Sequence, residues 1–231
     1  MADSDPDFDP SRVDVVTFDS YGTLVDTDSA ARALADLVDD PAATARRWRR
    51  NALLYSVVAG YVDAYGTYAD LHRDGLRDAL RAEGIDLDEG RLREINAAYR
   101  DLDPFADVAR GFERLADAGY HPSILSNGNP EWLDALVESA GIEESVATVV
   151  SADKIRTLKP DRALYVHAAD RVGAPPERIA HVTAHWLDVQ GAVHAGMQGV
   201  WLDRGGQWPS FGPRPALSIE SIGEVCALLG A

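Results

Sequence analysis

Outside residues 30–102, the chain alternates between short apolar runs and longer amphipathic segments. The apolar runs are rich in β-branched residues and bounded by turn residues, a pattern that predicts strands. They cover residues 13–18, 122–125, 147–150, 179–182 and 200–202. Helical periodicity predicts a helix that ends at Gly119, one from Pro130 to Gly141, and others over residues 162–172, 186–195 and 219–229.

Residues 30–102 follow a different pattern, because no strand signal interrupts them. Within this segment Leu54, Val57, Val58 and Tyr61 fall on one face of a predicted helix. Residues 68–82 and 91–99 carry similar helical patterns. The whole segment is therefore expected to be helical.

Alternation of strands and helices is typical of an α/β fold, a doubly wound parallel sheet with helices on both faces. Right-handed crossovers place the carboxyl ends of all the strands at one edge of the sheet. Ligands bind at that edge in such folds. The polar residues that follow the predicted strands are therefore candidates for function, namely Asp19, Ser126, Asn127 and the segments 153–159 and 183–188.

Asp19 ends the first predicted strand and is followed by Gly22 and Thr23 in a tight turn. A carboxylate at the ligand edge can act as a nucleophile. The structural alternative is an N-cap or an Asx turn. Taken alone, Asp19 leaves both interpretations open.

Ser126, Asn127 and Gly128 follow the second predicted strand. Their hydroxyl, amide and backbone N–H groups suit an anion or a developing negative charge. An Asn-Gly pair is also typical of a hairpin. A predicted helix follows here instead of a strand, which disfavours the hairpin.

Lys159 is one of two lysines in the chain and precedes Pro160, which disfavours a place inside a helix. Near Asp19, its charge would favour the ionised carboxylate and attract an anionic substrate. The alternative is a solvated lysine on the surface.

Asp188 lies one helical turn beyond the strand at residues 179–182. It can face the same cleft and orient Lys159 or water, or it can simply stabilise a helix N-terminus. His185, in the loop before it, is either a base for water or a bystander.

The net charge of −16 adds information about the surface and its partners. Nucleic acid and anionic membranes are poor partners for such a surface, and no apolar run approaches the roughly 18 residues of a membrane span. The 27 Asp, 11 Glu, 20 Arg and two Lys suit a protein in concentrated salt, where charge repulsion is screened. The alternative is a GC-rich genome that favours Arg over Lys. We expect a salt-rich cytoplasm.

Two further observations limit the possible classes of protein. Cys226 is the single cysteine, which excludes an intramolecular disulfide and a Cys-rich metal site. Residues 1–11 are expected to form a solvated acidic tail. This tail lacks the basic residue of a signal peptide before position 11.

Several segments match a known family in order and spacing. They are residues 18–24 (FDSYGTL), 126–128 (SNG), 159–165 (KPDRALY), 188–192 (DVQGA) and 199–202 (GVWL). On these segments the chain resembles the haloacid dehalogenase superfamily and, within it, the L-2-haloacid dehalogenases (haloacid dehalogenase type II). The resemblance implies a Rossmann-like core of residues 12–26 and 104–231. It also implies a helical cap, residues 27–103, inserted after the first strand.

The resemblance implies a role for each matching residue. Asp19 would be the nucleophile, Thr23 would hold its carboxylate, and Lys159 would keep it ionised. Asp188 would help to orient Lys159 and the hydrolytic water. The implied contacts with the substrate are Tyr21, Ser126, Asn127, Tyr165 and Thr183.

The reaction that the resemblance implies has two steps. Asp19 displaces halide from carbon 2 of a small 2-haloacid with inversion, and water then cleaves the aspartyl ester to give a 2-hydroxy acid. Neither a metal nor another cofactor is expected. The expected ligand is a small anionic acid, and the resemblance suggests a homodimer.

Tyr21 distinguishes this family from the phosphatases of the superfamily, which place a second Asp two residues after the nucleophile to protonate the leaving oxygen. A phenol has a pKa of about 10 and is a poor acid at neutral pH, whereas halide leaves unprotonated. Two alternatives stay open. One is a Mg²⁺-dependent phosphatase with Asp19, the carbonyl of Tyr21 and Asp188 as oxygen ligands. The other is a non-catalytic binder of small anions.

One departure from the family concerns an arginine on the first long cap helix, which grips the leaving halide. An ungapped alignment places this position at Ala59, so weak dehalogenation is expected, because such a donor is typically worth about 10²–10³ in rate. A neighbouring arginine can substitute, or the group can form a solvated basic face. The neighbours are Arg46, Arg47, Arg49 and Arg50.

The second departure is His185, which stands where many relatives have Asn. Its imidazole can still contact water. We therefore expect it to act as a base in ester hydrolysis, a role typically worth about 10²–10⁴-fold.

Overall fold

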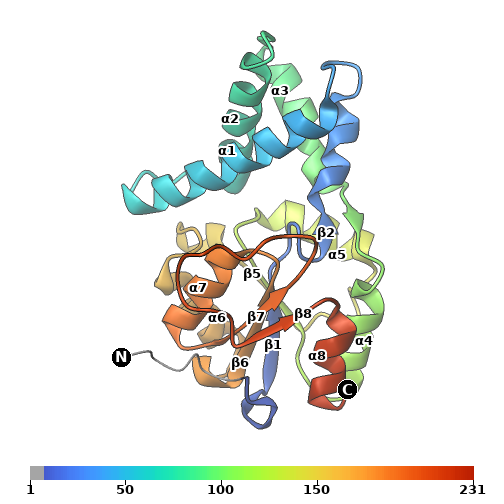
Figure 1. The fold of residues 1–231 in the computed structure, drawn as a ribbon, viewed down its shortest axis with the longest axis vertical. Coiled ribbons are helices and arrows are strands. Elements are labelled where there is room, and N and C mark those ends of the chain that lie inside the picture. The colour runs from blue at the N-terminus through green and yellow to red at the C-terminus, as the bar shows by residue number, and fades with distance from the viewer. Residues whose placement is uncertain (1–7) are drawn as a thin grey trace.

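Six parallel strands form the central sheet of the computed structural model, which describes residues 8–231 (Figure 1). Their order is β5-β4-β1-β6-β7-β8. The strands are β1 (Val15–Phe18), β4 (Ser123–Ser126), β5 (Thr148–Ser151), β6 (Ile179–Thr183), β7 (Gln198–Leu202) and β8 (Leu217–Ile219). The α/β fold predicted from the alternating pattern is confirmed.

The position of β1 explains where a ligand site can form. β1 pairs with β4 on one side and with β6 on the other, so Phe18 lies between Ile124 and Val182. The chain builds β4 and β5 on one side of β1 and then crosses to β6 on the other. A crevice opens at the carboxyl ends of the strands where the order changes direction, and Asp19 directly follows β1.

Helices cover both faces of the sheet. Alternate residues of β1 point to opposite faces. Val16 and Phe18 join a buried cluster with α4 (Val108–Asp117), α5 (Pro130–Ala140) and α8 (Ile222–Leu229). Val15 joins a second cluster with α6 (Arg162–Val172) and α7 (Trp186–Ala195). This two-faced burial explains why the strands read as continuous apolar runs.

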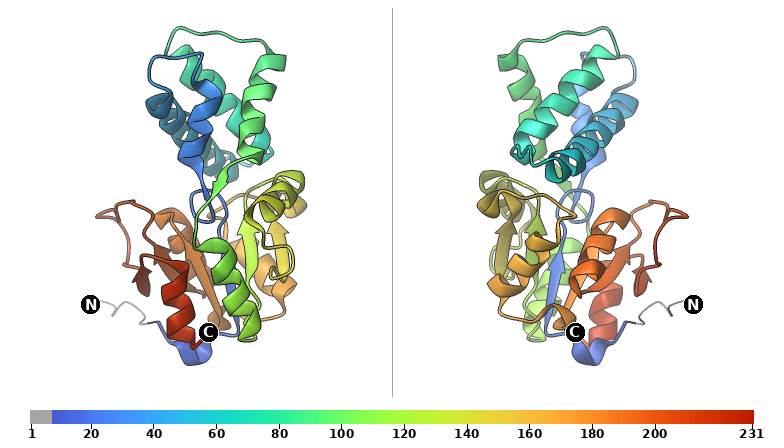
Figure 2. Two further views of the ribbon diagram at one scale, coloured as in Figure 1. Left: turned by 90° about the vertical axis from the view of Figure 1, so that its right-hand side faces the viewer. Right: turned by 90° about the vertical axis from the view of Figure 1, so that its left-hand side faces the viewer.

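A second group of helices lies beyond the carboxyl edge of the sheet, as Figures 1 and 2 show. They are η2 (Thr27–Leu34), α1 (Pro41–Tyr61), α2 (Tyr68–Arg81), α3 (Glu89–Asn96) and η3 (Ala97–Arg100). Two short antiparallel strands, β2 (Val25–Asp26) and β3 (Asp103–Pro104), carry the chain out and back. Asp26 pairs with Asp103, next to the two predicted domain boundaries. The division of the chain at residues 26 and 104 remains a prediction.

Small residues determine how α1 packs. Trp48, Ala52, Ser56 and Ala59 form much of its buried side. On α2, a Cβ at Gly75 would lie 2.9 Å from the backbone nitrogen of Ala52, so the two helices approach closely. Because this contact uses small residues, the apolar stripe predicted on α1 lies outside. Leu54, Val58 and Tyr61 are 56%, 48% and 91% exposed.

The structure also differs from the sequence-based elements near both ends of the chain. β8 was not predicted, since three residues are too few to show a period, and the last helix begins at Ile222 instead of residue 219. The first strand begins at Val15, because Pro10–Arg12 form the 3₁₀ helix η1. Two further 3₁₀ helices are η4 (Ala152–Ile155) and η5 (Pro176–Arg178).

The predicted acidic tail, residues 1–11, lies largely outside the residues that the structure describes. Its first seven residues lie outside the described part of the chain. The backbone N–H of Asp9 donates to the side chain of Gln198 at 2.8 Å, which attaches the following residues to the sheet. Among residues 8–231, no helix combines the length and apolar character that crossing a bilayer requires.

Candidate active site

The sheet fixes Asp19 at the carboxyl end of β1. Its backbone N–H donates to the carbonyl of Val182 in β6 at 3.0 Å. The following turn has Gly22 at a φ of +82°, a conformation that favours glycine. This turn lets Thr23 Oγ1 donate to Asp19 Oδ2 at 3.0 Å. Thr23 Oγ1 in turn accepts from the backbone N–H of Ala184 at 3.0 Å. The carboxylate of Asp19 is thus oriented by two adjacent strand ends.

Lys159 joins two carboxylates in a buried ion-pair network. Its Nζ donates to Asp19 Oδ1 at 2.8 Å and to Asp188 Oδ2 at 2.7 Å, and all three side chains are buried. Burial would lower the pKa of Lys159, but the charges of Asp188 and Asp19 outweigh this and raise it. Lys159 therefore stays charged at neutral pH. Its backbone N–H donates to Asn127 Oδ1 at 2.8 Å, which links it to the end of β4.

Asp188, in the first turn of α7, accepts hydrogen bonds on both carboxylate oxygens. Tyr165 donates to Oδ1 at 2.6 Å, and His181 Nε2 lies 3.0 Å from Oδ2. Burial would raise the pKa of Asp188, but Lys159 and His181 hold it well below its usual range. A Cβ at Gly191 would lie 2.4 Å from the Tyr165 hydroxyl, so glycine gives that hydroxyl its room.

A small cavity opens on this network, with a volume of about 50 Å³. Asp19 and Lys159 contribute polar atoms to its wall. Its other lining residues are Tyr21, Leu53, Tyr68, Asn127, His185, Leu187 and Asp188. Since a single water needs roughly 10–15 Å³ by this measure, the cavity has room for a few small groups.

The other expected substrate contacts lie behind the cavity wall. Ser126 is fully buried and its hydroxyl lies 2.6 Å from that of Ser20. Tyr165 binds Asp188, and Thr183 Oγ1 accepts from the N–H of His185 at 3.1 Å. Ser126, Tyr165 and Thr183 thus contact protein groups, and direct contact with a substrate remains a prediction for them.

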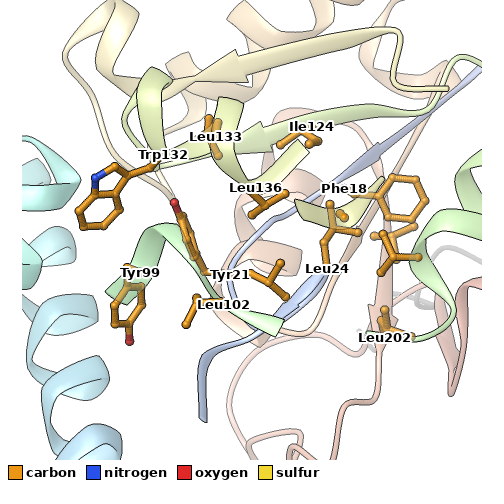
Figure 3. Close-up of a cluster of buried hydrophobic side chains, with 14 of the residues drawn as sticks. Phe18, Tyr21, Leu24, Tyr99, Leu102, Ile124, Trp132, Leu133, Leu136 and Leu202 are labelled. Atoms are coloured by element: carbon orange, nitrogen blue, oxygen red, sulfur yellow. The ribbon is translucent and has the colours of Figure 1, made fainter. Parts of the chain in front are cut away.

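Aromatic side chains close the cavity on the side of the helices. Tyr21 stacks on Tyr68 with ring centroids 5.2 Å apart, and Tyr99 and Trp132 lie within 6.5 Å of it. Figure 3 shows Tyr21 beside Tyr99 and Trp132, with Leu24 of the core on its other side. Burial, and then the charge of Asp19, raise the pKa of Tyr21 above its usual value. Its phenol therefore stays neutral and is a poor proton donor.

Arg49, on α1, contacts His185, a residue of the cavity wall. Its Nη2 lies 3.2 Å from His185 Nε2, beside the wall of the cavity. Ala59 lies ten residues further along the helix, about 15 Å away along its axis. Arg49 is therefore the neighbouring arginine that can substitute at the position assigned to Ala59.

The neighbouring arginines do not share this position. Arg46 and Arg50 are exposed, and Arg47 binds Glu83 at 3.1 Å. Leu53, one turn after Arg49, lines the cavity. The spacing of Arg49 and Leu53 on one helix face was the signal that could have identified the arginine.

His181 is a second residue that the sequence analysis missed. It lies within β6 and is fully buried. Its Nδ1 lies 2.9 Å from Thr17 Oγ1, and its Nε2 faces Asp188. A histidine inside an otherwise apolar strand was the available signal, because a buried polar group needs partners.

His185 lies at the N-terminus of α7, with Nε2 at 3.1 Å from the carbonyl oxygen of Tyr21. Burial lowers its pKa, so the imidazole is neutral at neutral pH. Its role as a base for water remains a prediction. Within residues 8–231 no group of three or more His, Cys, Asp or Glu side chains has a geometry suited to a metal ion.

Comparison with known proteins identifies the family. A model of the haloacid dehalogenase-like hydrolases matches residues 13–196. (S)-2-haloacid dehalogenase 4A of Burkholderia cepacia is 33% identical over 214 residues, 92% of this chain and 93% of that protein. (S)-2-haloacid dehalogenase 1 of Pseudomonas sp. (strain CBS-3) is 31% identical over 225 residues, 96% and 97% of the two chains.

A solved structure agrees with these relatives. It is an L-2-haloacid dehalogenase from Xanthobacter autotrophicus with chloropropionic acid covalently bound. It matches with a TM-score of 0.90 and 26% identity, over 95% of this chain and 99% of the other. The chain therefore belongs to the haloacid dehalogenase-like hydrolases and, within them, to the (S)-2-haloacid dehalogenase family.

Proposed function

We propose that this protein hydrolyses small (S)-2-haloacids to 2-hydroxy acids. The observation that carries the proposal is the Asp19 carboxylate, held by Thr23 and Lys159 at the wall of a small cavity. The relative of known structure that carries covalently bound chloropropionic acid supports the same chemistry.

In the first step, a carboxylate oxygen of Asp19 forms a bond to carbon 2 of the substrate. The carbon–halogen bond breaks, and the halide leaves with its electron pair. No proton is needed, so the neutral phenol of Tyr21 costs nothing at this step. Arg49, beside the cavity, stabilises the negative charge that develops on the halide.

In the second step, water attacks the carbonyl carbon of the Asp19 ester. The bond between that carbon and the ester oxygen attached to carbon 2 breaks. This oxygen came from Asp19, so the 2-hydroxy acid leaves with one original oxygen of Asp19. Water loses two protons in this step: one goes to the leaving oxygen and forms the hydroxyl of the product, and the other goes to solvent, so the whole reaction consumes one water and releases halide and a proton. Asp188 and Lys159 orient the water in this proposal.

The proposed reaction uses neither a metal nor another cofactor. A cation shared by Asp19 and Asp188 would have to displace Lys159, whose Nζ already lies within 2.8 Å of both. The phosphatase alternative also requires a proton donor, and burial disfavours that role for Tyr21. Dehalogenation that persists in EDTA is the expected result.

A substrate panel and an isotope experiment test the proposal. We expect turnover of chloroacetate and L-2-chloropropionate, and none of p-nitrophenyl phosphate with or without Mg²⁺, all in high salt. After a single turnover in ¹⁸O-water, the label should lie in the Asp19 carboxylate. Label found only in the product would mean direct attack of water on the substrate, and phosphatase activity alone would refute the proposal. Binding of the acids without turnover would favour the non-catalytic alternative.

We also propose a homodimer that forms through the second half of α1. Residues 51–62 carry no charge, although the chain has a net charge of −16. Leu54, Val58 and Tyr61 are exposed there, so two copies can meet with little repulsion and bury apolar surface. Sedimentation should show a dimer for the wild type and a monomer for Tyr61→Asp. Leu228→Asp, at an exposed position of α8, is the matched control.

The proposed location is a salt-rich cytoplasm. The support is compositional, an excess of Asp and a scarcity of Lys on a chain with a net charge of −16. The salt dependence of stability, described below, tests the salt-rich part of the proposal.

A further inference from the structure

His185 and Arg49 meet next to the turn that follows Asp19. His185 Nε2 lies 3.2 Å from Arg49 Nη2. A Cβ at Gly22 would lie 3.0 Å from the guanidinium and 3.3 Å from the imidazole, so the glycine leaves room for both groups. The contact joins α1 to the loop after β6, between two segments far apart in the sequence.

Hydrogen-bond chemistry determines which way this contact works. Arginine has donors and no acceptor, and the carbonyl of Tyr21 has an acceptor and no donor. His185 Nε2 faces both groups, at 3.2 Å and 3.1 Å, and can serve one of them at a time. A proton on Nε2 would place a donor against the donors of Arg49. A lone pair on Nε2 accepts from Arg49 in a charge-assisted bond, which is the stronger of the two arrangements.

The charged groups around His185 are consistent with a neutral ring. Burial lowers its pKa, and Arg49 lowers it further, whereas the charges of Asp19 and Asp188 raise it. The net direction is downward. Both carboxylates are also paired with Lys159. At neutral pH, His185 therefore carries one proton, and the contact with Arg49 favours its placement on Nδ1, which leaves Nε2 as an acceptor.

Arg49 is held in an unusual way for a chain so rich in acids. Arg47, two residues earlier, binds the carboxylate of Glu83. For Arg49, the bond to His185 is the one polar contact within the part of the chain that the structure describes. A carboxylate partner would neutralise the charge that a departing halide needs, whereas a neutral imidazole can hold the guanidinium and leave its charge free.

We propose that His185 is a positioning residue that holds the Arg49 guanidinium at the cavity, instead of a base for water. This inference rests on the proposed dehalogenase function and on the role of Arg49 in it. It assigns His185 to the first chemical step, release of halide. The sequence-based hypothesis assigns it to the second step, ester hydrolysis.

Two substitutions separate these roles. His185→Leu removes the acceptor at similar volume. His185→Gln can place an amide oxygen near the position of Nε2, which accepts from arginine but does not take a proton from water. Single turnovers of L-2-bromopropionate would be followed by rapid quench. Bromide release reports ester formation, and 2-hydroxy acid release reports hydrolysis.

We expect His185→Leu to slow bromide release about 10–10²-fold, because a misplaced group of this kind costs up to about 10²-fold. Ester hydrolysis should change little, and His185→Gln should recover most of the lost rate. In an Arg49→Ala background, His185→Leu should have no further effect, since residues that act as a unit are not additive. If His185→Leu does not fold, as judged by its melting temperature, His185→Gln decides between the roles by the step that it slows.

Three results would overturn the inference. Slow hydrolysis with normal bromide release in both variants would make His185 the base. Multiplicative effects of the Arg49 and His185 substitutions would show that the two residues act independently, and unchanged kinetics would make His185 a bystander. Absence of bromide release from the wild-type protein would instead refute the proposed function itself.

Discussion

The site draws on two regions that hold their charged groups in opposite ways. At the edge of the sheet, Lys159 lies between Asp19 and Asp188 in a buried network whose charges are paired. On α1, Arg49 contacts the neutral ring of His185, and no ion pair holds it within residues 8–231. The first region neutralises its charges internally, whereas the second keeps a positive charge available.

This difference matches the two moments at which the proposed reaction needs charge. The nucleophile must be ionised before the reaction begins, so its counter-ion belongs in a rigid network. Negative charge on the halide appears only as it leaves, so its partner is more effective when no carboxylate already occupies it. The ion pair with Lys159 thus keeps Asp19 ionised before the reaction. Arg49, which has no carboxylate partner within residues 8–231, is available to stabilise the transition state.

Asp19→Asn is expected to have the largest effect, because it removes the nucleophile while leaving an amide of the same size. Loss of a nucleophile typically costs at least about 10⁴-fold in turnover. Steady-state halide release in high salt measures this loss of turnover. Thr23→Val, which keeps the nucleophile and removes its hydrogen bond, should cost much less, and equal losses in both variants would contradict the assignment.

Lys159→Met should show that the network at the sheet edge is also structural. Removing one partner of a buried ion pair leaves uncompensated charge and typically costs about 3–5 kcal/mol of unfolding free energy. Urea denaturation would measure the loss. Lys154→Met is the matched control, since Lys154 is the other lysine and is exposed. Equal stability of the two variants would mean that the buried network does not contribute.

Arg49→Ala should lower the rate of halide release by about 10²–10³-fold, the usual cost of losing a donor to developing charge. Its effect on unfolding free energy should be small, in contrast to Lys159→Met. Arg46→Ala, at an exposed position one turn earlier, is the control. Ala59→Arg should not raise turnover, because Ala59 is buried and lies ten residues beyond Arg49 on α1; a gain there would restore the ungapped alignment.

His72 offers a test of a buried titratable group that lacks a counter-ion. Burial and the charge of Arg49 lower its pKa to about 3, and its Nδ1 has no hydrogen-bond partner. Below about pH 6.5, His72 binds a proton in the unfolded chain but stays neutral in the folded chain. The unfolding free energy should therefore fall as pH decreases. At pH 5 the loss is about 2 kcal/mol.

His72→Phe should remove this part of the acid slope. Urea denaturation of both proteins between pH 7.5 and pH 5, at constant salt, isolates the contribution, because the difference between them cancels other groups. Parallel slopes would show that His72 is protonated in the folded protein.

Salt should separate surface charge from the buried network. The melting temperature should rise between roughly 0.1 M and 2 M KCl, as the Debye length falls from about 10 Å to below 3 Å. The destabilisation by Lys159→Met should persist at 2 M KCl, because buried pairs are screened less. A wild-type melting temperature that stays constant or falls with added KCl would contradict the interpretation that the composition is adapted to salt.

Most of the sheet-edge network could be predicted from sequence. Asp19, Lys159 and Asp188 each follow or lie near a predicted strand end, and parallel strands bring those ends together. The contact between Lys159 and Asp19 joins two strand ends, whereas that of Lys159 with Asp188 also depends on the first turn of α7. Tyr165 and Thr23 came from the family resemblance, and the structure gives each of them a hydrogen bond within the same network.

The α1 side was less predictable, for a physical reason. Four arginines occur within five positions, and successive residues on a helix point in different directions. Which of them meets the site depends on the rotation of α1, and packing on α2 through small residues determines that rotation. The same rotation turns Leu54 and Tyr61 outward, although their spacing resembles that of a buried face.

The sequence by itself determined the fold class and the placement of Asp19 directly after the first strand, because a period of two or 3.6 is a local property of the chain. Tertiary structure alone decided that Arg49 contacts His185 at the cavity wall, whereas Ala59 is buried elsewhere on α1. It also decided that His181 joins Asp188 and that Tyr68 and Leu187 line the cavity. Each of these contacts joins segments far apart along the chain, and how helices and strands pack against one another is not recorded in local periodicity.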